Sequence, residues 1–191
     1  MITRHIVGSP NQDYSLTYDA ENRLVSVSGS ASATFTYDAD GSRVETVVNG
    51  ATTFYIGNYY EIAITAFGAI PTKYYYTGGQ RVAMRQNGVL SYLFSDNLGS
   101  TTVTADTSGT NTGELRYSAW GGTRYSSGTT QTSYHYTGQI EDNIGLYYYN
   151  ARYYDNYITQ FTQPDPIIPD PYNPLDWNRY SYVRYNPIHW A

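Results

Sequence analysis

The sequence repeats one pattern in two consecutive stretches, Tyr14-Ser15-Leu16-Thr17-Tyr18-Asp19-Ala20-Glu21-Asn22-Arg23-Leu24-Val25-Ser26-Val27 and Ala33-Thr34-Phe35-Thr36-Tyr37-Asp38-Ala39-Asp40-Gly41-Ser42-Arg43-Val44-Glu45-Thr46-Val47. In each, polar and apolar residues alternate before and after a short turn, which predicts a strand, a turn and a second strand. An aspartate in the turn can cap backbone amides, and the asparagine or glycine after it can adopt a positive φ. Each stretch is therefore predicted to be one β-hairpin. The residues that define the two turns are Tyr18, Asp19, Asn22, Tyr37, Asp38 and Gly41.

Further hairpins are predicted downstream. The dipeptides Asn49-Gly50 and Asn87-Gly88 are strong signals for two-residue hairpin turns. The strands predicted beside them are residues 45–48 and 52–56, and residues 81–86 and 89–94. A polar turn over residues 106–113 is predicted to join strands at 100–105 and 114–120. Because an isolated hairpin is marginally stable, we expect an all-β fold of stacked β-hairpins that form a curling, spiral, shell-like sheet.

Composition supports a sheet and disfavours several functions. The chain of 191 residues has 24 Tyr and no Cys, which favours strands and excludes disulfides and thiolate metal sites. Only 14% of residues are charged, the net charge is −5 and there is one lysine, so nucleic acid is not an expected partner. No apolar run reaches membrane-spanning length, and residues 1–8 lack a signal-peptide pattern. The neutral polar surface favours a secreted or cell-surface protein. Its export signal is expected outside this chain, or its export route uses no cleaved signal.

The C-terminal part differs in character. Six of the eight prolines lie between Pro164 and Pro187, and proline is not compatible with a central strand. We expect an irregular, extended, Pro-rich segment packed against the sheet, followed by a short element over residues 179–185. The apolar residues expected to make that packing are Ile167, Ile168, Tyr172, Leu175 and Trp177. The predicted organisation is an N-terminal extension (1–13), a β-sheet wall (14–155) and a plug segment (156–191).

The two Tyr-Asp stretches resemble YD repeats, and an ordered series of later motifs resembles the RHS repeat-associated core. The residues that carry the core resemblance are Asp96, Leu98, Gly99, Gly138, Gln139, Gly145, Leu146, Tyr147, Arg152, Tyr153, Tyr154, Asp155, Asp165, Arg179, Tyr180, Asn186 and Pro187. In RHS, toxin-complex and teneurin-like proteins, such hairpins spiral into a hollow shell whose core closes one end. In bacterial members the shell encloses a C-terminal toxin, often released by self-cleavage. The resemblance thus implies a shell wall with part of its plug.

The chain also departs from this family. Asp155 is followed by Asn156 where the family has proline, and Gln160 stands where the family has arginine. The family continues into an Asp-Pro-x-Gly segment that would carry a second self-cleavage carboxylate, and this sequence ends before it, at Ala191. Asp165, Asp170 and Asp176 could supply a carboxylate for acid/base chemistry, with Asp165 the member that the resemblance favours. An aspartate before proline or asparagine also commonly caps a turn, and this is the favoured interpretation of all three. We therefore predict no enzyme activity and no cofactor.

Other chemistry is not indicated. His5, His135 and His189 are scattered, so neither a metal site nor a catalytic triad is predicted. A calcium loop starting at Asp38 would need Glu where the chain has Asn49. Tyrosines and arginines could form a sugar-binding face, although their recurrence within repeats favours cross-strand structure.

Three functions follow as hypotheses. The first is a non-enzymatic scaffold, a segment of a β-shell associated with the encapsulation and delivery of a toxin. The second is an extracellular fibre or adhesin that self-associates through open sheet edges, with sugar binding as an option. The third is a self-cleaving aspartyl protease core that uses Asp165. The expected partners are further shell repeats or copies of the same chain, together with a toxin cargo.

Overall fold

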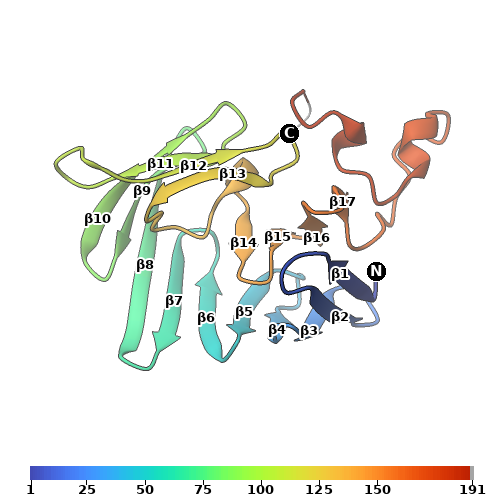
Figure 1. Cartoon of the computed structure of the whole chain (residues 1–191), viewed down its shortest axis with the longest axis horizontal. Helices are drawn as coiled ribbons and strands as arrows, with labels where there is room; N and C mark the ends of the chain where they lie inside the picture. The colour runs from blue at the N-terminus through green and yellow to red at the C-terminus, as the bar shows by residue number, and fades with distance from the viewer. Residues whose placement is uncertain (190–191) are drawn as a thin grey trace.

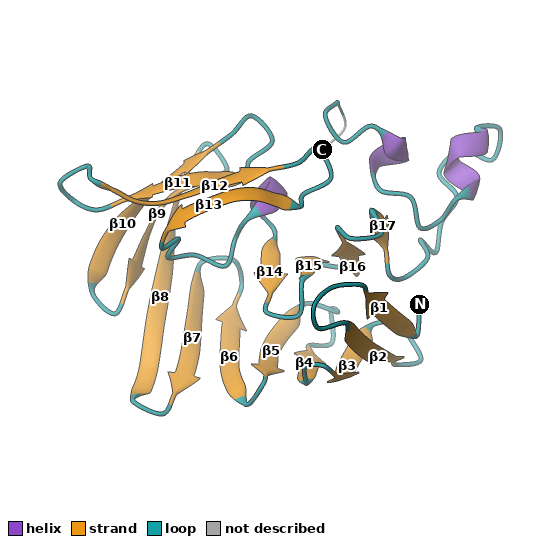
Figure 2. Ribbon diagram, in the orientation of Figure 1, coloured by secondary structure: helices purple, strands orange, loops and turns teal. Residues whose placement is uncertain are grey.

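The computed structural model describes residues 1–189, which form two antiparallel sheets (Figures 1 and 2). Within these residues the larger sheet, called the wall below, has thirteen strands in the order of the chain. Its strands are β1 (Thr3–Ile6), β2 (Gln12–Tyr18), β3 (Leu24–Gly29), β4 (Ala33–Tyr37), β5 (Arg43–Val48), β6 (Ala51–Ile56), β7 (Tyr60–Thr65), β8 (Gly68–Thr77), β9 (Gln80–Gln86), β10 (Val89–Ser95), β11 (Thr101–Ala105), β12 (Asn111–Tyr117) and β13 (Thr123–Gly128). The predicted fold of stacked hairpins is confirmed.

The wall curves around the second sheet, called the core sheet below (Figure 1). Its strands are β14 (Ile140–Asp142), β15 (Leu146–Tyr149), β16 (Arg152–Asp155) and β17 (Gln160–Phe161). The structure therefore places β1 within the predicted N-terminal extension and most of the core sheet within the predicted wall. The division at residues 13 and 155 stays a prediction.

Five turns of the wall share one hydrogen-bonding pattern. In four of them an aspartate Oδ1 accepts the backbone N–H groups of the second and fourth residues after it; these are Asp19, Asp38, Asp96 and Asp106. In the fifth, the hydroxyl of Ser118 accepts the N–H of Gly122. The residue three positions after the aspartate or serine has a positive φ in every case: Asn22, Gly41, Gly99, Gly109 and Gly121. The wall thus repeats the Tyr-Asp turn with other sequences.

The same turns account for five of the six register shifts in the described wall, and the sixth, between Tyr75 and Tyr76, precedes Gly78-Gly79. The strand pairing shifts register immediately before each of them, for example between Thr17 and Tyr18 and between Thr36 and Tyr37. Such bulges accompany hairpin loops that end in a positive-φ residue and increase the local twist. The turn predicted over residues 106–113 is shorter in the structure, because it follows the same five-residue pattern. The five-residue pattern that starts at Asp106 closes at Thr110, so β12 begins at Asn111 and ends at Tyr117.

Successive strand residues of the core sheet point to opposite faces, and each face packs in a different cluster of buried side chains. Leu146 and Tyr153 pack with inward-facing wall residues such as Leu16 and Phe35. On the opposite face, their chain neighbours join a cluster of aromatic side chains, namely Tyr136, Tyr147, Tyr154, Phe161 and Tyr182. The ring centroids of Tyr154 and Tyr182 are 4.4 Å apart. Tyrosine thus supplies most of the packing on this second face.

The Pro-rich segment is irregular, as predicted, with short 3₁₀ turns at Pro174–Trp177 and Val183–Tyr185. Its predicted packing against the sheet is wrong for most of the apolar residues named. Ile167, Tyr172, Leu175 and Trp177 are exposed. The segment folds on itself through Asp170 and Asn173. It contacts the core sheet through Asp165, which pairs with Arg152, and through residues 179–182, where the Tyr180 carbonyl accepts the N–H of Phe161 at 2.9 Å.

Candidate functional site between the wall and the core sheet

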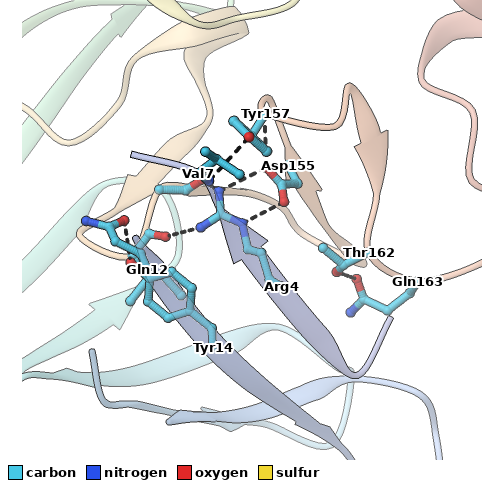
Figure 3. A network of polar contacts seen from close by, with 10 residues as sticks. Arg4, Val7, Gln12, Tyr14, Asp155, Tyr157, Thr162 and Gln163 are labelled. Carbon is cyan, nitrogen blue, oxygen red and sulfur yellow. Dashed lines mark hydrogen bonds and ion pairs between the residues drawn. The ribbon is translucent and has the colours of Figure 1, made fainter. Parts of the chain in front are cut away.

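A buried ion pair joins the first wall strand to the core sheet (Figure 3). The guanidinium of Arg4 in β1 binds both carboxylate oxygens of Asp155 in β16, with Nε–Oδ2 at 2.6 Å and Nη2–Oδ1 at 2.9 Å. The exposed fractions of the two side chains are 3% and 0%. Arg4 also donates to the carbonyl oxygens of Ile144 at 2.8 Å and Gly145 at 3.0 Å. Each of the three guanidinium nitrogens of Arg4 thus has a hydrogen-bond partner, and such a bidentate geometry is the one in which a buried charge pair is best tolerated.

A second buried pair joins the second Tyr-Asp hairpin to the core sheet. Arg43 Nη1, in β5, lies 2.5 Å from Asp142 Oδ2 and 3.0 Å from the hydroxyl of Tyr153. Its guanidinium carbon lies 4.2 Å from the ring centroid of Tyr148 and 4.9 Å from that of Tyr55. Nε and Nη2 have no hydrogen-bond partner among the described residues. Cation–π contacts with the tyrosine rings stabilise this part of the guanidinium instead. Burial opposes the charge of Arg43, yet the carboxylate of Asp142 raises the pKa of the guanidinium well above its ordinary value.

Three core tyrosines fix the last wall turn. Their hydroxyls donate to three consecutive carbonyl oxygens: Tyr136 to Ala119 at 2.7 Å, Tyr154 to Trp120 at 2.9 Å and Tyr147 to Gly121 at 3.0 Å. Gly121 has a φ of 82°, and a Cβ there would lie 2.6 Å from the Tyr136 ring. Only glycine fits this position, because the turn packs directly on the aromatic cluster of the core sheet.

The candidate catalytic residue Asp165 lies in a different place, at the base of the Pro-rich segment. Its Oδ2 lies 3.0 Å from Arg152 Nη2, and its Oδ1 accepts the N–H of Ile167 at 3.0 Å. The guanidinium of Arg152 stacks 3.9 Å from the Phe161 ring centroid, and burial lowers the pKa of Arg152. Asp165 therefore combines the turn-capping role that its sequence predicts with an ion pair.

A cavity of about 150 Å³ lies beside Asp165. Arg152 and Arg179 line it together with a second bidentate pair, in which Arg184 Nε and Nη2 lie 2.6 and 2.7 Å from the carboxylate oxygens of Asp176. The structure thus brings Asp165, Arg152 and Arg179 of the predicted core motif together, and it adds Asp176 and Arg184.

The other residues of the predicted core motif fall into four groups. Asp96, Leu98 and Gly99 belong to a wall turn, where Asp96 acts as the aspartate of the shared turn pattern. Gly138 and Gln139 lie where the chain crosses from the wall to the core sheet. The core-sheet members are Leu146, Tyr147, Arg152, Tyr153, Tyr154 and Asp155, and Gly145 lies in the turn before β15. Tyr180, Asn186 and Pro187 lie in the C-terminal segment, where Tyr180 contacts β17 and Asn186 follows the 3₁₀ turn Val183–Tyr185.

Three residues of the buried ion pairs were not predicted from sequence: Arg4, Arg43 and Asp142. One sequence feature could have indicated them: a charged residue at a strand position whose side chain, by the alternation of the strand, is expected to face the core. Arg4 is such a residue, since it lies two positions before Ile6, which packs against the core cluster. Their partners are 151 and 99 residues away along the chain, which a reading of local pattern does not reveal.

A larger cavity of about 550 Å³ opens between the wall and the core sheet, next to the second Tyr-Asp turn. Arg81 lies at its edge, stacked 3.3 Å from the ring centroid of Tyr134, and donates from Nε to the hydroxyl of Tyr76 at 3.1 Å. Arg81 of β9 therefore contacts Tyr76 of the wall and Tyr134 of the crossing to the core sheet. Among residues 1–189, no group of three or more His, Cys, Asp and Glu residues is arranged to hold a metal ion.

Comparison with known proteins decides the family. The chain is 31% identical over 188 residues to the tRNA nuclease WapA of Bacillus subtilis (strain 168), a match that covers 92% of this chain and 8% of WapA. It is also 31% identical over 108 residues to the toxin subunit YenC1 of Yersinia entomophaga, which covers 53% of this chain and 11% of YenC1. The chain belongs to the RHS/YD-repeat proteins. No family model matches it.

Solved structures agree with the RHS/YD-repeat fold. A crystal structure of TcdB2-TccC3 superposes with a TM-score of 0.77 at 22% identity, over 92% of this chain and 10% of that one. The same complex without its hypervariable C-terminal region gives 0.78 at 21% identity. At this identity the likeness shows the fold. The RHS/YD-repeat chain thus corresponds to about a tenth of the length of these proteins. Within the described residues, no helix is long and apolar enough to span a membrane.

Proposed function

We propose that the chain is a non-enzymatic segment of an RHS-type β-shell that encloses and helps to deliver a toxin outside the cell that makes it. The observation that carries the proposal is the pair of buried Arg–Asp contacts, which fix an inner sheet against a curling wall. Relatives named as a toxin subunit and as nucleases support a link to toxins, and the cargo is part of this proposal.

The proposal also includes partners at the sheet edges. β1 and β13 stand at the two ends of the strand order, so each has one edge without a partner strand among the described residues. All six residues of β13 are exposed, and it contains neither proline nor lysine, the residues that commonly protect an edge. We infer that these edges pair with further shell repeats or with copies of the chain.

Light scattering over a range of concentrations tests this pairing. The unmodified chain is expected to associate, whereas Thr123→Lys combined with Ser127→Lys in β13 should shift it toward the monomer. Thr107→Lys combined with Asn111→Lys adds the same charge at another exposed site and serves as the control. A chain that stays monomeric at every concentration contradicts the proposal.

A fibre or adhesin is the second candidate, because the same open edges could stack copies of the chain without a cargo. Electron micrographs of the associated protein separate the two functions. Closed hollow particles support the shell, and filaments support the fibre.

The absence of enzyme activity is part of the proposal, and self-cleavage is its alternative. Asp165 is engaged by Arg152 and by a backbone amide, which is the environment of a structural carboxylate. Intact mass measured during prolonged incubation should stay constant. A cleavage product that disappears in Asp165→Asn but persists in Asp170→Asn would establish self-cleavage instead.

A further inference from the structure

The first strands of the wall carry their apolar residues on the face toward the core sheet. Leu16 of β2 and Phe35 of β4 pack in the buried cluster, and the next residues along these strands face outward. The outward row across β2, β3 and β4 is polar and consists of Thr17, Ser26 and Thr34. An antiparallel sheet with one covered face and one solvated face has this arrangement.

The arrangement is reversed in β6, β7 and β8. The paired residues Tyr55, Glu61 and Thr72 point toward the core sheet, because they line a cavity of about 220 Å³ together with Asp142 of β14. The row beside them is therefore turned outward. This outward row is apolar and consists of Phe54, Ile62 and Pro71.

Neighbouring positions enlarge the outward row into an apolar surface, called the outer patch below. Ile56 and Ile64 lie two positions from Phe54 and Ile62 and point the same way, with exposed fractions of 63% and 42%. The exposed fraction of Phe54 is 41%. The outer patch consists of Phe54, Ile56, Ile62, Ile64 and Pro71. Single exposed apolar side chains are ordinary, whereas adjacent ones mark a surface that binds a partner.

Charges of opposite sign border the outer patch on its two sides. Glu45 of β5 is the cross-strand neighbour of Phe54, and on the other side Lys73 of β8 is paired with Arg85 of β9. Glu45 accepts a hydrogen bond from the hydroxyl of Thr36 at 3.0 Å, and neither Glu45 nor Lys73 forms an ion pair within the described part of the chain. A surface that is acidic on one side and basic on the other is complementary to a second copy turned over by a twofold axis.

We propose that the outer patch is an interface between two copies of this chain, packed face to face about a twofold axis parallel to the strands. β6 of each copy lies over β7 of the other and β5 lies over β8, about 10 Å apart as in other packed sheets. Glu45 of one copy then lies above Pro71 of the other, and Lys73 follows about 7 Å further along β8, within reach of the carboxylate. Two such ion pairs border an apolar centre. This contact goes beyond edge pairing, because it uses a face of the wall and does not involve β13.

Sedimentation velocity over a range of concentrations tests the interface in the variant that combines Thr123→Lys with Ser127→Lys, whose edge pairing is blocked. This variant, called the edge-blocked chain below, should still form a dimer. Adding Phe54→Ser and Ile62→Ser should raise its dissociation constant about a hundredfold, since both copies lose apolar contact area. Val89→Ser is the control: Val89 is 68% exposed in the β9–β10 hairpin, outside the outer patch, and its loss should leave the dissociation constant unchanged.

Exchange of the two charges tests the proposed orientation. In the edge-blocked chain, Glu45→Lys alone and Lys73→Glu alone should each weaken the dimer about tenfold, because like charges then meet. An equimolar mixture of these two variants should associate as tightly as the edge-blocked chain, since every position 45 again faces a position 73 of opposite sign. Glu21→Lys makes the same charge change in the first Tyr-Asp turn, where the side chain is 72% exposed, and should not weaken the dimer.

The outcomes separate this interface from the edge pairing proposed above. An edge-blocked chain that is monomeric at every concentration overturns the interface, and so does a mixture that associates no better than its two components. If that monomer instead binds vesicles of phosphatidylserine and phosphatidylcholine, and loses this binding with Phe54→Ser and Ile62→Ser, the outer patch belongs to a lipid surface. An unmodified chain that forms the same dimer as the edge-blocked chain, and nothing larger, contradicts the edge pairing and supports the interface.

Discussion

The wall and the core sheet are both antiparallel, yet they hold their places by different means. Every wall strand pairs with its neighbours in the chain, and five turns of one design set the bends. The core sheet also pairs strand to neighbouring strand, but its position depends on Arg4–Asp155 and Arg43–Asp142, whose partners are 151 and 99 residues apart. The shape of the wall thus depends on residues close together in the sequence. The position of the core sheet against the wall depends on a few residue pairs that are far apart in the sequence.

The two kinds of contact also differ in their contribution to the free energy of folding. Contacts between neighbouring strands close short loops, while the wall-to-core pairs must order a long intervening chain. Each pair also places two charges in a shielded interior, where the loss of one partner leaves the other uncompensated. Substitutions at the long-range pairs should therefore cost more than substitutions at the turns.

The largest effect is expected from Arg43→Met, which leaves the Asp142 carboxylate buried without its partner. The free energy of unfolding should fall by about 3–5 kcal/mol in urea denaturation. Arg43→Met combined with Asp142→Leu removes both charges and should recover a large part of the loss. Equal losses in the single and double variants would contradict the role assigned to this pair.

A smaller loss is expected where the last wall turn packs on the core sheet. Gly121→Ala places a Cβ against the Tyr136 ring at a φ of 82°. We expect a loss of about 2–4 kcal/mol, from the left-handed backbone together with overpacking. Gly109→Ala is the matched control, because Gly109 has the same φ and nothing lies within 4 Å of its Cβ position. Its thermal midpoint should fall clearly less; equal shifts would show that the contact with Tyr136 does not matter.

The smallest loss is expected within a wall turn. Asp38→Ala removes the carboxylate that accepts the N–H groups of Asp40 and Ser42, and it should cost about 1 kcal/mol. Asp40→Ala, in the same turn, removes an exposed carboxylate and should change the stability by less than about 0.5 kcal/mol. If Asp38→Ala lowered the free energy of unfolding as much as Arg43→Met, the proposed difference between local and long-range contacts would be contradicted.

The same comparison explains what could be predicted from the sequence. The hairpins at Asn49-Gly50 and Asn87-Gly88 and the two Tyr-Asp turns have local signatures, and the structure forms strands where these signatures place them. The turn at Asp106 has the same aspartate and glycine spacing, and that spacing gives its five-residue length. Arg4 and Arg43 have no such signature, because their partners are fixed only when the wall curves around the core sheet. Asp165 was singled out through the family resemblance, and its ion pair with Arg152 required the structure.

Hydrogen exchange in Arg4→Met tests most directly whether buried ion pairs hold the core sheet in the wall. Asp155 would lose its bidentate partner, and exchange should rise in residues 140–161 while residues 12–48 stay protected. Arg116→Met, which removes an exposed pair with Glu114, should change neither region. Unchanged exchange in residues 140–161 of Arg4→Met, or an equal rise throughout the wall, would contradict the account.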